Sequence, residues 1–212
     1  MKAADLAVWT ALLVALPFVV VVATSFLKFA VVLAILRRAF GGSAIPPASV
    51  SAALALVFAL FVTAPVAEKA WAEIAPALTG KGDAAALLAA AERAKEPVRG
   101  FLMQHTPERE RQSFLELQRQ LRPAAERAAV TDRDLVVLAA GFATAELKAA
   151  FQVGFLLFLP FLVLDLLCAT VLLSLGMNTI QPEAVSLPFK LLLFLVADGW
   201  HLLMRGLVLS YT

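Results

Sequence analysis

Cysteine and histidine, two residue types that commonly build catalytic and metal sites, are scarce in this chain of 212 residues. The single cysteine, Cys168, cannot form a disulfide within the chain, and in its apolar run we expect a small buried hydrophobic side chain. The two histidines, His105 and His201, stand in no metal-ligand pattern such as HExxH. The sequence also has no Gly-rich phosphate loop and no CxxC pair. We therefore expect no enzymatic activity, no metal and no cofactor.

Charge is scarce as well. Charged residues make up 16% of the chain, whereas a soluble domain carries about 25%. The formal net charge of +2 provides no basic surface of the kind that nucleic acid requires. Hydrophobic residues make up 61% of the chain, and the mean hydropathy is +0.86. This apolar excess is too large for an ordinary soluble core, so a membrane or a very dry assembly must bury it.

The charges that are present gather in the middle of the chain. Residues 68–148 hold 12 acidic and 12 basic residues, which is 24 of the 34 charged residues. The sequence therefore predicts an all-α protein of membrane-associated helical hairpins. Its three parts are an N-terminal apolar helical hairpin at 1–67, a charged helical middle segment at 68–148 and a C-terminal apolar helical hairpin at 149–212.

The N-terminal part predicts two apolar helices joined by a basic loop. The uncharged run Leu6–Leu27 would span about 33 Å as a helix, enough for a bilayer, and Ala48–Ala67 is a second uncharged helix. Lys28, Arg37 and Arg38 lie between them and favour a cytoplasmic loop, which places the middle segment on the periplasmic side. A cleavable signal peptide is the alternative for the first run. That run is long for one and lacks a small-x-small site, so we expect an uncleaved segment.

The middle segment predicts short soluble helices. Thr106 and Pro107 suit the N-cap and first position of one helix, and Pro123 closes it. Thr131, with Asp134 three residues later, resembles the capping box of another. Glu and Arg alternate throughout, which is typical of a solvated helical surface.

Asp165 is the most informative single residue. It lies within an apolar helix expected to run from Phe151 to Leu175. A carboxylate at such a position must be paired, protonated or in contact with water. Lys190, one helix–loop–helix away, is the cation most easily brought to it. A structural ion pair between helices or subunits is favoured over a proton or ion relay, which needs several titratable groups in line.

The last helix, expected from Ser186 to about Leu209, carries a polar face. At about 100° per residue, its four polar groups fall within about 80° of one another: Lys190, Asp198, His201 and Arg205. Lipid does not tolerate such a face, so neighbouring helices or a water-filled lumen must cover it. We therefore expect that the isolated chain is not a stable monomer.

Several sequence blocks carry a resemblance to a known family. The C-terminal blocks are Phe158–Asp165, Leu175–Met177, Leu187–Phe194 and Asp198–Trp200. Further blocks are Thr24–Phe26 with Lys28, the Pro46-Pro47 turn, Thr63–Pro65, Glu96-Pro97 with Phe101–Met103, and Glu146–Phe155. Together they resemble, over nearly the whole chain, the FliP/SctR family, whose members are R-type subunits of the flagellar and injectisome type III export apparatus.

The resemblance implies a gate in the bacterial inner membrane through which unfolded proteins leave the cytoplasm. It implies a homo-oligomer, expected as a pentamer, that assembles with S-type and T-type subunits into a helically staggered cone among other membrane proteins of the export apparatus. It further implies that Asp165 and Lys190 form an ion pair between subunits. The lack of a separate signal peptide favours an injectisome member over a flagellar one.

The resemblance also implies a pore closed by the loop at 176–182. Its proposed gate residues are Gly176, Met177, Asn178 and Thr179. The family commonly carries consecutive methionines here, so the single Met177 followed by Asn178 and Thr179 is a departure. A ring of Met177 thioethers from several subunits would close the pore, with Asn178 and Thr179 hydrogen-bonding the loop backbone.

Two alternative functions remain open. One is a proton- or ion-conducting membrane subunit that uses Asp165, Asp198 and His201. Proton flux that is lost in Asp165→Asn, with assembly intact, would favour it. The other is a structural scaffold of the export apparatus without a pore role, which normal gating after changes in the loop at 176–181 would favour.

Overall fold

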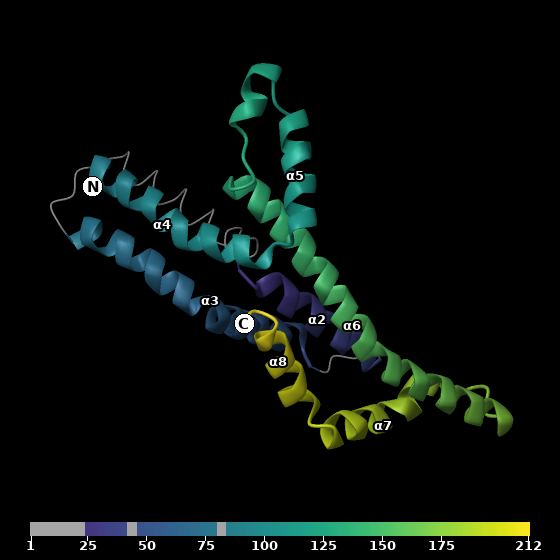
Figure 1. Ribbon diagram of the computed structural model, residues 1–212. Coiled ribbons are helices and arrows are strands. Elements are labelled where there is room, and N and C mark those ends of the chain that lie inside the picture. Colours follow the sequence, from purple (N-terminus) through teal and green to yellow (C-terminus); the bar gives the residue numbers. More distant parts are fainter. Residues whose placement is uncertain (1–23, 42–45, 80–83) are drawn as a thin grey trace, which may run out of the picture. The chain divides into compact units, whose positions relative to one another are not determined.

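The computed structural model describes residues 24–41, 46–79 and 84–212 (Figure 1). Within these ranges the chain forms helices and no strand, which confirms the all-α prediction. The first expected helix, Leu6–Leu27, lies outside the described residues except for its last four positions. The elements are α2 (Phe26–Ala39), α3 (Ala48–Thr79), α4 (Ala84–His105), α5 (Glu108–Gln120), the 3-10 helix η1 (Ala124–Ala129), α6 (Leu135–Ser174), α7 (Pro182–Val196) and α8 (Gly199–Leu209).

Two of the described helices, α3 over Ala48–Ala77 and α6 over Leu135–Ser174, are long and apolar enough to cross a membrane. The pair α7 and α8 passes the same test together, although it is bent by 60°. Only 22% of the apolar window of α3 and 11% of that of α6 are buried within the chain. These helices therefore present apolar surface that lipid or other helices must cover.

Both long helices extend beyond the predicted limits. α3 continues past the expected end at Ala67 to Thr79, with Pro65 and Pro76 inside it. α6 starts at Leu135, so it joins the end of the charged middle segment to the apolar run without a break. Charged residues near Lys148 suggested a boundary there, but Glu and Lys are good helix formers and do not end a helix.

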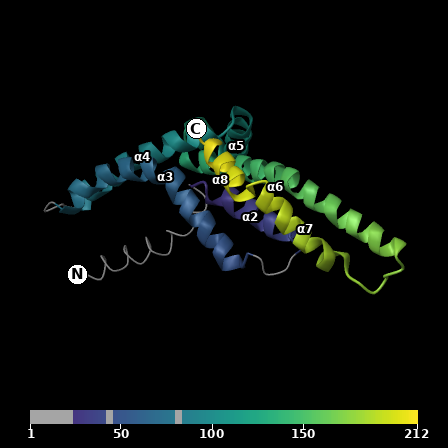
Figure 2. The same cartoon turned by 90° about the horizontal axis from the view of Figure 1, so that it is seen from below.

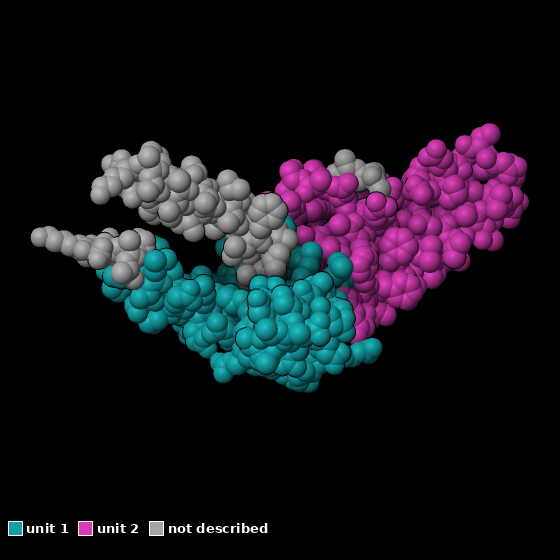
Figure 3. All heavy atoms as spheres, turned by 90° about the horizontal axis from the view of Figure 1, so that it is seen from above, with its two compact units in different colours: residues 1–27, 59–147 teal, residues 28–58, 148–212 magenta. Residues whose placement is uncertain are grey.

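The chain separates into two compact units, coloured in Figure 3: residues 1–27 with 59–147, and residues 28–58 with 148–212. In the first unit, α4 packs against α6 through Phe101 and Phe142, whose ring centroids are 5.7 Å apart. A small core of Leu115, Val130 and Val137 holds α5 against the start of α6. Exposed ion pairs contribute little to such a unit.

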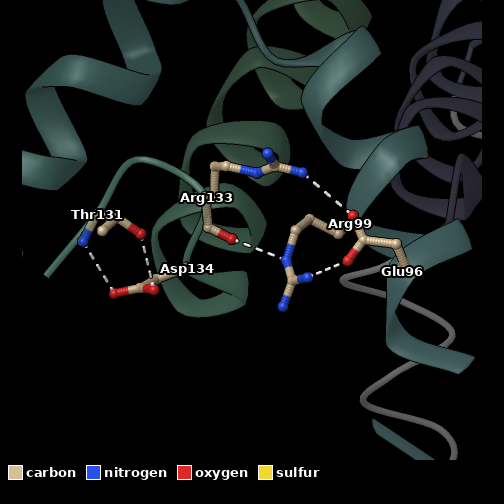
Figure 4. Close-up of polar contacts among 5 residues, drawn as sticks. All are labelled: Glu96, Arg99, Thr131, Arg133 and Asp134. Atoms are coloured by element: carbon tan, nitrogen blue, oxygen red, sulfur yellow. Dashed lines mark hydrogen bonds and ion pairs between the residues drawn. The ribbon is translucent and has the colours of Figure 1, made fainter. Parts of the chain in front are cut away.

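The two helix caps predicted for the middle segment differ from the caps that the structure shows. Thr106 does not cap α5, because its hydroxyl donates to the Leu102 carbonyl at 2.6 Å, and Pro107 takes the N-cap position. The Thr131 N–H donates to the Asp134 carboxylate at 3.2 Å, and the Thr131 hydroxyl lies 3.1 Å from the same carboxylate. This turn precedes α6, which begins after Asp134 (Figure 4). Beside it, Arg99 donates to the Arg133 carbonyl at 3.0 Å.

The second unit is built around α2. Its buried residues Phe29, Val32, Leu33 and Leu36 are spaced three and four apart and are at most 1% exposed, as expected of an amphipathic helix that faces a core. α2 lies beside α6 and α8 (Figure 2), and its last residue, Ala39, contacts Lys190 of α7. Gly154 of α6 lies against Ile35 so closely that a Cβ there would overlap the Ile35 side chain. The absence of a side chain at Gly154 lets α6 approach α2.

The sequence predicted that three basic residues lie in a loop between the first two apolar helices, and this prediction is wrong. Lys28, Arg37 and Arg38 all lie within α2. Arg37 and Arg38 occupy its last turn, where cations are favoured by the helix dipole. Lys28 is buried near the start of the helix, with 5% of its surface exposed.

Candidate functional site

Lys190 lies on the buried face of α7. The helix begins with Pro182, whose fixed φ suits the first helical position, and Glu183 lies in its first turn. Its buried residues are Ser186, Lys190 and Phe194, which recur every four positions and therefore share a face. This face points into the second unit, and only 1% of the Lys190 side chain is exposed.

The ammonium group of Lys190 is held by two acceptors. Its Nζ lies 2.7 Å from Asp165 Oδ2 and 2.8 Å from the Ala39 carbonyl oxygen. The other carboxylate oxygen, Asp165 Oδ1, accepts a hydrogen bond from Ser186 Oγ at 2.5 Å. A buried charge is stable only when it is paired and hydrogen-bonded, and the buried ammonium group of Lys190 has both a carboxylate and a carbonyl partner.

The contact with Ala39 makes Lys190 part of the C-terminus of α2. The last four carbonyls of a helix have no partner within it. Here the N–H of Phe40 reaches Leu36 O at 3.2 Å, and the N–H of Gly41 reaches Arg38 O at 3.0 Å. Lys190 takes the carbonyl of Ala39 and brings a positive charge to the negative end of the helix dipole. One ammonium group thus connects α2, α6 and α7.

An aromatic cluster adjoins this junction. The Phe40 ring lies edge-on to Phe161 at 5.1 Å and to Phe194 at 5.4 Å, and Trp200 lies edge-on to Phe194 at 5.3 Å. The three phenylalanines are between 2% and 7% exposed. Edge-to-face packing of this kind adds stability beyond the area buried. The cluster helps keep water from the junction, which strengthens the ion pair and raises the cost of breaking it.

The structure brings Asp165 and Lys190 together within one chain, whereas the resemblance implied a pair between subunits. Sequence reasoning missed the other members of the junction. Ser186 carried a usable signal, since it lies one helical turn before Lys190 and so on the same face. The Ala39 carbonyl and the Phe40 ring carried none, because they come from a helix about 150 residues away.

The expected single last helix is wrong, because it breaks between Val196 and Gly199. Asp198 adopts a left-handed conformation with φ of 49°, which a short polar residue tolerates. The 60° bend removes the common polar face predicted for the whole segment. Lys190 faces the junction and is buried, whereas Asp198, His201 and Arg205 are exposed.

The predicted gate loop follows a well-defined end of α6. Gly176 has φ of +71°, its N–H donates to Leu173 O at 3.1 Å, and the Met177 N–H donates to Leu172 O at 2.9 Å. These two bonds form a Schellman motif, which requires the left-handed residue that glycine supplies. Within the described residues, the side chains of Asn178 and Thr179 make no hydrogen bond. Met177 is 46% exposed at the tip.

A second buried lysine, missed by the sequence analysis, ties the end of the chain to α2. Lys28 Nζ lies 3.2 Å from Ser210 Oγ and 4.0 Å above the centre of the Tyr211 ring. Tyr211 is 9% exposed and stacks on Phe29 at 6.4 Å. A cation over an aromatic face is stabilised most when both are removed from water, as here.

In the part of the chain that the structure describes, no three His, Cys, Asp or Glu residues are grouped as metal ligands. The contacts found at the junction are an ion pair, hydrogen bonds and aromatic packing. Together with the apolar helices, the junction defines a class: an all-helical membrane protein whose C-terminal hairpin is locked to an earlier helix by a buried lysine.

The sequence comparisons identify the family within that class. The FliP family matches residues 9–207, and the chain belongs to it. It is 40% identical over 210 residues to the hypersensitivity response secretion protein HrcR of Ralstonia nicotianae, covering 98% of this chain and 97% of that protein. It is 38% identical to the Yop proteins translocation protein R of Yersinia pestis, covering 98% and 95%. It is 39% identical to the flagellar biosynthetic protein FliP of Pectobacterium carotovorum, covering 92% and 74%.

Proposed function

We propose that the chain is a subunit of a type III protein export gate, forming with like subunits and small partners a gated channel for unfolded proteins. The observation that carries the proposal is the family match over residues 9–207, with relatives named for both secretion and flagellar biosynthesis. The higher coverage of the secretion relatives supports an injectisome member. The gate acts by assembly and by opening, so the proposed role involves no chemistry.

The apolar surface of the chain supports its assembly with other subunits. In α6, large side chains such as Phe155, Leu156 and Leu173 are between 62% and 67% exposed. We propose a homo-oligomer, as a pentamer, together with S-type and T-type gate subunits and other membrane proteins of the export apparatus. Its place is the bacterial inner membrane, with the charged segment at 68–148 on the periplasmic side.

The ion-conducting alternative has less support. A relay would need Asp165, Asp198 and His201 in line. Asp165 is instead held by Lys190 and Ser186, whereas Asp198 and His201 are exposed beyond the break. The scaffold alternative differs from the gate only in what the loop at 176–182 does.

Deleting the gene in its own bacterium tests the proposed function. We expect secretion of type III substrates to stop and to return when the full chain is supplied in trans, while export by the general secretory pathway continues. The readout is the amount of each substrate in the medium relative to the cells. Unchanged type III secretion in the deletion strain would refute the proposal, and a simultaneous loss of general export would indicate a membrane defect instead.

The loop makes a separate prediction about the closed state. In a reconstituted, fully assembled complex, Met177→Ala should raise the leakage of small ions, because a flexible apolar thioether seals a narrow gap that a methyl group leaves open. Ile180→Ala is the matched control, since Ile180 lies in the same loop and is 42% exposed against 46% for Met177. Liposome ion-flux measurements give the readout. Leakage at the parent level in Met177→Ala would place the seal elsewhere and favour the scaffold.

A further inference from the structure

Three exposed polar side chains lie within a stretch that is apolar enough to cross a membrane: Asp198, His201 and Arg205. Their side chains form no hydrogen bond or ion pair with any described residue. Charged side chains within a membrane-spanning stretch are costly, and such groups are almost always paired or in contact with water. These side chains therefore call for partners outside the chain.

The chain cannot pair these charges with one another. Asp198 and Arg205 are seven residues apart, which is about 10 Å along a helix. His201 lies one turn before Arg205, so the nearest polar side chain to Arg205 along α8 is another basic group. Asp165 belongs to the same unit, but it is already bonded to Lys190 and Ser186.

The surface beside Arg205 is a groove. It has a volume of about 450 Å³, and α8 contributes Trp200, His201, Met204 and Arg205 to its wall. Phe58 of α3 also lines it. The groove is apolar apart from its two basic side chains, so it suits an apolar group that carries a carboxylate.

The corner between α7 and α8 combines apolar side chains with a carboxylate. Leu195 is 76% exposed and Val196 is 79% exposed, and Asp198 follows them directly. The left-handed turn at Asp198 interrupts the helix here, so the corner projects these side chains at the bend. The corner and the groove are thus complementary in both polarity and charge.

We propose that the corner of one copy (Leu195, Val196 and Asp198) docks into the α8 groove of a second copy, where Asp198 pairs with Arg205. The inference rests on the proposed function, because it needs several copies in one complex. Corner and groove are different surfaces, so the contact is head-to-tail, and each added copy offers another free corner or groove. Copies in one membrane share an orientation, so neighbouring α8 helices are offset by about 10 Å, the rise between the paired positions.

Cysteine cross-linking tests this contact. In a Cys168→Ser chain expressed with its partner subunits, Asp198→Cys with Arg205→Cys should form disulfides between copies on mild oxidation. The two positions within one chain are about 10 Å apart along the helix, beyond the roughly 7 Å that a disulfide tolerates between Cα atoms. We expect a ladder of dimers, trimers and larger species on a non-reducing gel. Each single cysteine variant should give none.

Leu202→Cys combined with Asp198→Cys is the matched control. Leu202 is 60% exposed and near Arg205 on α8, but it lines a different groove, beside Lys28 and Leu203. Cross-linking as strong as with Arg205→Cys would overturn the assigned contact. A product that stops at the dimer would also overturn it, because it would indicate a two-fold contact instead of a head-to-tail one.

Native gels of the same samples separate this inference from the proposed function. If the full complex forms and the double cysteine variant gives no disulfide, the contact is wrong and the gate proposal stands. Labelling of Arg205→Cys by a membrane-impermeant thiol reagent in such a complex would then assign this face to water. If the unmodified chain forms no complex with itself or its partners, the gate proposal itself fails.

Charge reversal gives an independent measurement. Arg205→Asp or Asp198→Arg alone places like charges across each contact, and we expect a loss of assembled complex of about a hundredfold, since like-charge juxtaposition strongly disfavours an interface. The combination of both changes restores opposite charges at every contact and should recover assembly to within about threefold of the parent. A double variant no better than the single variants would overturn the pairing.

Discussion

Replacing Lys190 with alanine is expected to destabilise the folded chain by about 3–5 kcal/mol, because it breaks an ion pair whose lysine is buried and leaves the partly buried Asp165 carboxylate, 27% exposed, without its counter-ion. The change removes the bond to Asp165 at 2.7 Å and the bond to the Ala39 carbonyl at 2.8 Å. Asp165→Ala should cost a similar amount, since it leaves an ammonium group that is 1% exposed without its counter-ion. Denaturant unfolding in detergent, followed by tryptophan fluorescence, measures both. Both variants should also impair assembly of the complex.

Combined changes distinguish the ion pair from simple packing. Asp165→Leu with Lys190→Met removes both charges and keeps the volume, so it should recover most of the loss. The Ala39 carbonyl would still lack its donor, which leaves a cost of about 1–3 kcal/mol. Reversing the pair, Asp165→Lys with Lys190→Asp, should restore only part of the stability. It places a carboxylate beside the Ala39 carbonyl oxygen at the negative end of α2.

Glu183→Ala provides the control for this series. Glu183 is exposed in the first turn of the same helix, where its interaction with the helix dipole contributes about 0.3–1 kcal/mol. We therefore expect Glu183→Ala to be the most stable of these variants. The apolar double variant should follow, then the reversed double variant, and the two single variants should be the least stable. Single variants that unfold and assemble like the parent would show that the junction does not depend on the ion pair.

The part of this site that the sequence predicts is the part that a local rule governs. A carboxylate in an apolar run needs a partner, and this requirement alone pointed from Asp165 to Lys190. No comparable rule points to the Ala39 carbonyl, because every residue carries one and only the fold selects which is near. Lys28 is similar: its partners Ser210 and Tyr211 stand at the other end of the chain.

For the helices too, the sequence predicts what a local rule governs and misses what depends on the fold. Apolar runs correctly predicted α3 and α6, but their ends depend on where a helix can no longer continue, and charge does not stop a helix. The break after Val196 was missed for a different reason. The segment has no proline there, and an Asp-Gly pair is a weak signal within a strongly apolar helix. Asp198 takes a left-handed conformation next to Gly199, which lies close against the Phe194 ring, and only the folded chain shows this contact.

Gly199 should therefore tolerate no side chain. A Cβ at this position would overlap three atoms of the Phe194 ring. That ring cannot move aside easily, because it packs against Phe40, Phe161 and Trp200 and is 7% exposed. Overpacking of this kind costs about 1–3 kcal/mol. We expect Gly199→Ala to lower the free energy of unfolding by that amount and to weaken assembly, since it disturbs the corner that carries Asp198.

Gly206 of the same helix supplies the matched control. A Cβ there meets no atom within 4 Å, and φ lies in the ordinary range. Because alanine is about 0.5–1 kcal/mol better than glycine inside a helix, Gly206→Ala should leave stability unchanged or raise it slightly. The same change in the same helix thus has opposite expected signs at two positions one heptad apart. Equal destabilisation of both variants would mean that α8 responds to helix propensity alone. A neutral Gly199→Ala would mean that the Phe194 ring is free to move, so the aromatic cluster would not fix the bend between α7 and α8.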